Sequence, residues 1–222
     1  MHLTLLVLLA APADYSAVKA ELSALRQRTQ VQLAKAATEP QRAAALASAR
    51  EQLLAAFDTQ LFPAWAGTPW DFYGTTQAPR EGKIACGYYV STLMRDAGFK
   101  VERVKLAQQA SEWIVRTLAE NDQTLRFREI EARPLLAQVR RKLGEGLFVV
   151  GMDYHVAFLR IDAKGEQLCH AAFFEPKAAV CEDAATSPGF ASAYHVVGKL
   201  FADAQLRGWL EGRSFPVRRA TD

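Results

Sequence analysis

The sequence is poor in cysteine, in histidine and in long apolar runs. Its 222 residues include three cysteines and four histidines without CxxC or HxxxH spacing, so a metal site ranks last and no cofactor is expected. After the N-terminus, no segment is apolar over the about twenty residues that a membrane-spanning helix needs. The net charge of +3 is too small to indicate nucleic-acid binding, and the 50 % hydrophobic share is that of a globular protein.

An apolar run of eleven residues, Leu3 to Ala13, lies at the start of the chain and ends in Ala11-Pro12-Ala13. The run is too short to span a bilayer, and its small terminal residues suit signal peptidase. No Lys or Arg precedes it, which leaves a buried N-terminal strand or helix as the alternative. We expect a signal peptide at residues 1–13 and a periplasmic or secreted protein, with no integral membrane segment after cleavage.

Good helix formers dominate residues 14–60, and Thr38 followed by Pro40 is typical of a helix start. We therefore expect an antiparallel helix pair as an N-terminal extension, either packed on the rest of the chain or serving as a spacer. The amino-acid composition changes at Leu61, where glycine, proline and aromatic residues occur together. We place a catalytic domain at residues 61–222.

Apolar periodicity inside this domain separates helices from strands. Helices are expected after Cys86 up to Gly98, at 107–119, at 133–143 and at 201–210, and strands at 100–104, within 146–162, at 166–176 and at 190–198. Helices followed by a run of strands predict an α+β fold, with the helix that carries the cysteine packed on an antiparallel sheet.

Cys86 lies where a glycine-containing loop becomes a helix. The helix dipole and the free N–H groups at that point favour a thiolate, and the same N–H groups suit a developing oxyanion. Gly87 would let a substrate approach closely. Cys169 and Cys181 are 12 residues apart; two buried thiols are favoured, and a disulfide remains open.

Histidine supports the choice of Cys86, because His155 and His170 fall in successive predicted strands. Two antiparallel neighbours joined by a short turn would bring the imidazoles side by side. A thiol on a helix, a base on a facing strand and a polar residue on the next strand form the arrangement of a nucleophilic hydrolase. His155 is the expected base and His170 the residue that orients it, whereas His195 is interpreted as structural.

Four segments together, GTPWDFYGTT, IACGYYVSTLM, DYHVAFLRI and LCHAAF, resemble the NlpC family of papain-like cell-wall cysteine peptidases. The resemblance covers about residues 66 to 175. It implies a papain-like fold in which Cys86, His155 and His170 are the catalytic residues. Trp70 replaces the tyrosine that the family usually has near its oxyanion site, and Tyr73 is the candidate for the missing hydroxyl.

The motif also reads Ala-Cys-Gly where the family has Asp-Cys-Ser, and the interval between cysteine and histidine is enlarged, which indicates a divergent branch. The resemblance implies amide hydrolysis through a thioester acyl-enzyme, with a peptide or peptidoglycan-like substrate and no nucleic acid. Three alternatives stay open: a papain-like acyltransferase, an inactive envelope binding module and, last, a metal site.

Overall fold

The computed structural model describes residues 15–219, so the expected signal peptide lies outside the described residues. The elements are α1 (Tyr15–Lys35), α2 (Glu39–Ala56), the π-helical turn η1 (Phe57–Leu61), α3 (Phe62–Trp65), α4 (Cys86–Asp96), β1 (Lys100–Val101), α5 (Arg103–Ala107), α6 (Ser111–Leu118), the 3-10 turn η2 (Asn121–Gln123), β2 (Thr124–Arg128), α7 (Ala132–Leu143), β3 (Gly146–Met152), β4 (Val156–Asp162), β5 (Gly165–Ala171), β6 (Ala179–Asp183), the 3-10 turn η3 (Pro188–Phe190), β7 (Tyr194–Lys199), α8 (Asp203–Glu211) and β8 (Ser214–Phe215). The fold is α+β, as the sequence predicts. Across the described part of the chain, no helix is both long enough and apolar enough to cross a bilayer.

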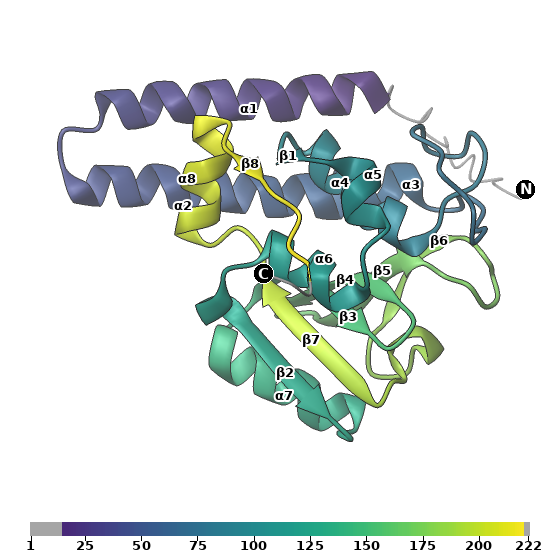
Figure 1. Cartoon of the computed structure of the whole chain (residues 1–222). Coiled ribbons are helices and arrows are strands. Elements are labelled where there is room, and N and C mark those ends of the chain that lie inside the picture. Colours follow the sequence, from purple (N-terminus) through teal and green to yellow (C-terminus); the bar gives the residue numbers. More distant parts are fainter. Residues whose placement is uncertain (1–14, 220–222) are drawn as a thin grey trace, which may run out of the picture.

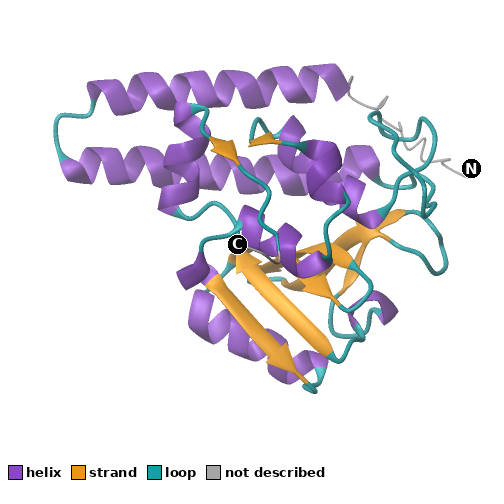
Figure 2. Ribbon diagram, in the orientation of Figure 1, coloured by secondary structure: helices purple, strands orange, loops and turns teal. Residues whose placement is uncertain are grey.

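A six-stranded antiparallel sheet is the centre of the fold, with strand order β2-β7-β3-β4-β5-β6. Figure 2 shows the sheet below the helices, with α7 beside it. The strands β3, β4, β5 and β6 are neighbours in both sequence and space, because short connections favour antiparallel pairing. A short parallel pair, β1 with β8, lies apart from this sheet.

Side chains alternate between the two faces of the sheet and build two apolar layers. Val149 and Phe158 belong to a large core shared with α4, α6 and the N-terminal helices. Val150 and Leu159, their neighbours in sequence, belong to a second core under α7. The sheet is therefore covered on both faces, which explains the nearly continuous apolar runs of β3 and β4.

The two N-terminal helices pack on the sheet domain (Figure 1). Thr38 caps α2 through a reciprocal capping box with Gln41, which fixes the turn between the helices. The helical path then continues through η1 into α3, and the ring of Phe57 lies 5.5 Å from that of Phe158 in the sheet. The expected boundary at residues 60/61 thus falls inside one helical segment, and one core joins both sides of it.

Helix α4 begins at Cys86 because Ala85 is still extended, and it ends before Gly98, whose φ of +89° suits glycine at a helix C-terminus. Val90, Leu93 and Met94 are fully buried against the core. The structure therefore confirms a helix that carries the cysteine and packs on an antiparallel sheet.

Three local expectations need correction. The strand expected at 100–104 is only two residues long, because the chain turns into α5 at Arg103. Strand β2 was not expected, and it pairs with β7 from far along the chain. Cys169 and Cys181 are not two separate thiols but a disulfide, since the register of β5 and β6 places the two residues directly opposite each other.

Candidate active site

Cys86 is a free, partly buried cysteine at the first turn of α4. Backbone groups of Val156 and Gly87 lie close enough to its sulfur to act towards a lower thiol pKa, so Cys86 lies beside the residue that follows His155. Burial nevertheless raises the pKa of the Cys86 thiol above its ordinary value and outweighs these backbone donors. This differs from the sequence-based expectation: the donors at the helix start are present, but the resting group is a thiol.

His155 and His170 lie side by side, as the predicted strand order required. Atom Nε2 of His155 is 2.7 Å from Nδ1 of His170, and the two ring centres are 4.9 Å apart. Both side chains are buried. His155 lies immediately before β4 and His170 near the end of β5, so adjacent antiparallel strands position the pair.

Two further polar residues extend this contact and were not found from the sequence. Atom Nε2 of His170 is 3.1 Å from Oε1 of Glu182 in β6, and the hydroxyl of Ser187 donates to the same carboxylate oxygen. The signal that could have found Glu182 is the pairing of Cys169 with Cys181. In that antiparallel register Glu182 lies opposite Leu168 and His170 lies opposite Val180, so His170 and Glu182 are diagonal neighbours on the same face of the sheet.

The other nitrogen of His155 has no partner. Atom Nδ1 is buried and hydrogen-bonded neither to Cys86 nor to any other described residue. Burial, and secondly the nearby charge of His170, lower the pKa of His155 from 6.5 to about 3. Burial also lowers the pKa of His170, while Glu182 acts in the opposite direction. Both rings are therefore neutral at pH 7, and Nδ1 of His155 is an unpartnered ring nitrogen in a dry environment.

Aromatic side chains border the histidine pair. The ring of Phe173 lies 5.4 Å from that of His155 and 6.4 Å from that of Trp70, which places Trp70 near the site as the sequence suggested. Trp70 is held by its backbone, whose N–H donates to Lys177 O. Its indole N–H bonds to none of the described residues. Phe173 and Trp70 therefore form an apolar wall that borders the histidine pair.

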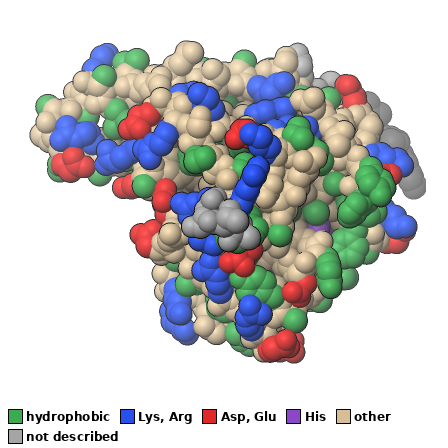
Figure 3. Space-filling view, in the orientation of Figure 1, with side chains coloured by type: hydrophobic (Ala, Val, Ile, Leu, Met, Phe, Trp, Pro, Cys, Tyr) green, Lys and Arg blue, Asp and Glu red, His purple; other side chains and the backbone are tan. Residues whose placement is uncertain are grey.

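Tyr73 is not part of the buried group. It is 85 % exposed, its ring contacts Phe72, and its hydroxyl bonds to none of the residues that the structure describes. Large exposed hydrophobic side chains nevertheless concentrate near the site. Of the six in the described chain, Phe72, Tyr73, Tyr154 and Phe173 lie in the loop before Cys86 or within three residues of His155 or His170. Figure 3 shows hydrophobic side chains gathered on one side of the molecule, near a visible histidine.

Gly87 has a different role from the one expected. A Cβ at this position would lie 2.4 Å from the carbonyl oxygen of Ala107, so glycine is needed for the close approach of α4 and α5 rather than for substrate. Gly189 is a second such residue, which sequence reasoning missed. A Cβ there would lie 2.7 Å from Cε1 of His170, so Gly189 leaves the space that this ring occupies.

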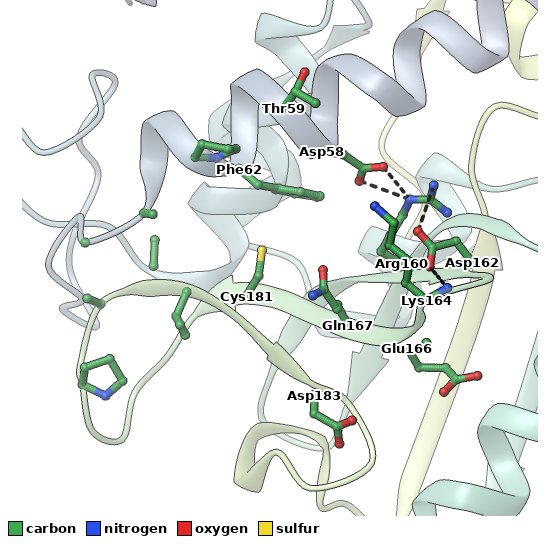
Figure 4. Close-up of a pocket in the computed structure, with 18 residues that line it drawn as sticks. Asp58, Thr59, Phe62, Arg160, Asp162, Lys164, Glu166, Gln167, Cys181 and Asp183 are labelled. Atoms are coloured by element: carbon green, nitrogen blue, oxygen red, sulfur yellow. Dashed lines mark hydrogen bonds and ion pairs between the residues drawn. The ribbon is translucent and has the colours of Figure 1, made fainter. Parts of the chain in front are cut away.

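A separate cavity lies away from these residues. A cavity of about 820 Å³ opens between η1, α3 and the strands β4 to β6, and neither Cys86 nor the two histidines line it. Figure 4 shows Arg160 ion-paired with Asp58 and Asp162 at one end, with the sulfur of Cys181 facing the hollow. The charges of Arg160, Asp58 and Asp162 at this end are ion-paired, and neither the free cysteine nor a histidine lines the cavity.

Other candidates are accounted for structurally. The imidazole Nε2 of His195 lies 2.8 Å from Phe190 O, which agrees with its interpretation as a structural residue. Within residues 15–219, no group of three or more His, Cys, Asp or Glu side chains is arranged to hold a metal ion. In comparisons with known proteins, no family model, no curated protein and no solved structure matches this chain.

Proposed function

We propose that this chain is a papain-like cysteine hydrolase, a peptidase or amidase that cleaves an amide bond through a thioester acyl-enzyme. One observation supports this most strongly. A free cysteine at a helix start has its sulfur beside Val156, and the preceding residue, His155, presents an unpartnered basic nitrogen that a second histidine supports from behind. This is the nucleophile, base and orienting group of acyl transfer.

In this mechanism the resting pair is neutral. Atom Nδ1 of His155 takes the proton of the Cys86 thiol as sulfur bonds to the carbonyl carbon of the substrate. The proton then passes from His155 to the amide nitrogen, the carbon–nitrogen bond breaks, and the amine leaves a thioester on Cys86. Water, deprotonated by His155, attacks the thioester and releases the acid and the free thiol.

The oxyanion that forms in both steps needs hydrogen-bond donors. The backbone N–H groups at the start of α4 lie at the nucleophile, and the indole N–H of Trp70 has no other partner among the described residues. Tryptophan donates but does not accept a hydrogen bond, which suits this role. We therefore assign Trp70 rather than Tyr73 to the oxyanion site, with Tyr73 and Gly87 outside it.

The proposed substrate class is peptide or peptidoglycan-like, and the proposed location is the bacterial envelope or the medium. The disulfide between Cys169 and Cys181 supports an oxidising compartment, because such bonds rarely persist in the cytosol. The resemblance to the NlpC family supports the choice of substrate and remains an interpretation of the four motifs.

The test is to trap the acyl-enzyme. The protein is incubated with peptides and purified cell-wall fragments, and its intact mass is followed together with the release of new amines. We expect turnover that Cys86→Ser abolishes and that His155→Ala lowers more than His170→Ala, because an orienting residue matters less than the base. Turnover that persists in Cys86→Ser would refute the assignment.

A papain-like acyltransferase is the second candidate, and the dryness of the site favours it. His155 is 4 % exposed and Phe173 packs against it, so bulk water has little access to the thioester. An acceptor amine that binds at the site would then compete well with water. Adding amines of increasing size to the acylated enzyme separates the two, since an acyltransferase gives the amide product in preference to the acid.

A further inference from the structure

Glu182 lies at the far end of a line of hydrogen bonds that begins at the imidazole ring of His155. The line runs from His155 Nε2 to His170 Nδ1 over 2.7 Å and from His170 Nε2 to Glu182 Oε1 over 3.1 Å. Its start, His155 Nδ1, is the atom that must accept the thiol proton in the proposed function. The direction of each hydrogen bond in this line therefore decides whether that atom is a base.

We propose that Glu182 is a positioning residue that sets the protonation pattern of both histidines and thereby makes His155 Nδ1 the free base. This inference rests on the proposed function for its catalytic meaning. Its structural content, the position of the two imidazole protons, stands independently and is measurable without a substrate.

An ionised carboxylate only accepts hydrogen bonds, so His170 Nε2 must carry a proton and donate it to Glu182. A neutral imidazole has one N–H, which leaves His170 Nδ1 as an acceptor. The facing atom, His155 Nε2, must then be the donor. By the same rule His155 Nδ1 has no proton, and its lone pair is free, in agreement with its lack of any hydrogen-bond donor among the described residues.

Glu182 itself is held in place by its surroundings. The hydroxyl of Ser187 donates to the oxygen that faces His170, which supports the ionised, acceptor-only form. The disulfide joins Cys169 to Cys181, and these are the residues immediately before His170 and Glu182. The covalent bond thus holds β5 and β6 in the antiparallel register in which His170 and Glu182 are diagonal neighbours on one face of the sheet.

The charge of Glu182 has a second effect during reaction. When His155 Nδ1 takes the thiol proton, a positive charge forms in a buried site where burial opposes it. Glu182 is the carboxylate that bonds to the supporting histidine, and it stabilises this charge through His170. Both effects are lost when the carboxylate is replaced by an amide, which is neutral and can donate as well as accept.

The test compares Glu182→Gln with Glu166→Gln. Glu166 lies on the neighbouring strand and its side chain is 28 % exposed, as is that of Glu182, but it pairs with Arg140 instead of a histidine. The same atoms change in each variant, and so does the net charge. Long-range proton–nitrogen NMR correlations report which imidazole nitrogens carry protons. Acylation by p-nitrophenyl acetate, followed by release of nitrophenolate, reports the thiol and its base.

We expect the wild type and Glu166→Gln to show an unprotonated His155 Nδ1 and a protonated His170 Nε2. Glu182→Gln should show a mixed or reversed pattern and lose at least about ten-fold in acylation rate at pH 7, because part of the population no longer has the base. Glu182→Asp, which keeps an acceptor-only carboxylate, should show the wild-type proton pattern. Circular dichroism checks that each variant is folded.

Two outcomes are decisive. A wild-type proton pattern in a folded Glu182→Gln variant overturns the inference, even if its acylation rate falls. If the wild type shows the expected pattern and Glu182→Gln reverses it, but no variant is acylated by any probe, then Glu182 sets the protons as inferred while the proposed function is wrong.

Discussion

The neutral state of His155 makes the stability of the fold depend on pH in a way that can be calculated. Its pKa is lowered from 6.5 to about 3 by burial, and then by the charge of His170. A folded-state pKa below the unfolded one means that the unfolded chain binds the proton more readily. The free energy of unfolding is therefore unaffected by the titration of His155 above pH 6.5 and decreases as the pH falls towards 3.

Each pH unit below 6.5 removes about 1.4 kcal/mol, so that at pH 5 this one histidine destabilises the fold by about 2 kcal/mol relative to pH 7.5. With a urea m-value of about 2 kcal/mol per molar for a chain of this size, the midpoint of unfolding moves down by about 1 M. The side chain is 4 % exposed, so solvent screening reduces this figure little.

The assay is urea unfolding of the wild type and of His155→Gln at pH 7.5 and at pH 5. Glutamine does not titrate, while the other buried histidines, His170 and His195, remain in both proteins. We expect the variant to be less stable than the wild type at pH 7.5 and to lose most of that disadvantage at pH 5. A stability difference that stays constant between the two pH values would show that His155 titrates normally in the folded protein.

Three further predictions follow from the same contacts. Because burial raises the pKa of Cys86, iodoacetamide should label it slowly at pH 7 and faster above pH 9. Rapid labelling at pH 6 would contradict this. Gly87→Ala should lower stability in urea by about 1–3 kcal/mol, because its methyl group meets the carbonyl of Ala107; an unchanged midpoint would show that the helices yield without cost. Replacing Cys169 and Cys181 by alanine should lower the free energy of unfolding by about 3 kcal/mol in the same assay. Mass spectrometry of the unreduced, alkylated wild type should find one modified cysteine, and three modified cysteines would exclude the disulfide.

The parts of the fold that the sequence predicted are those in which one local signal is strong. The apolar runs of β3 and β4 are separated only by Asp153, Tyr154 and His155, and the helix after Cys86 ends at a glycine with positive φ. Adjacency of successive antiparallel strands was then enough to bring His155 to His170. These inferences needed only nearest-neighbour order along the chain.

The parts that were missed depend on register or on distant pairing. Strand β2 reads TLRFR, an edge strand with two arginines among its five residues. Its position depends on pairing with β7, which lies about seventy residues later in the chain. Glu182 falls beside His170 only when β5 and β6 pair with Cys169 opposite Cys181, and a shift of one residue would turn it to the other face. The burial that sets the pKa of Cys86 is likewise a property of the packed structure.

Burial shifts the pKa values of Cys86 and His155 in opposite directions. The hydrogen bonds from His155 through His170 to Glu182 thereby become more important for the proposed reaction. Burial raises the pKa of the Cys86 thiol and lowers that of His155, so both shifts oppose a resting ion pair. In the proposed reaction the proton would therefore move while the bond between sulfur and carbon forms, and the rate would depend on a lone pair of His155 that already faces the thiol. A site with a preformed thiolate would tolerate a wrong imidazole tautomer more easily. If the proposed reaction takes place here, the tautomer of His155 contributes to its barrier, and Glu182, two hydrogen bonds away from His155, should then affect the rate.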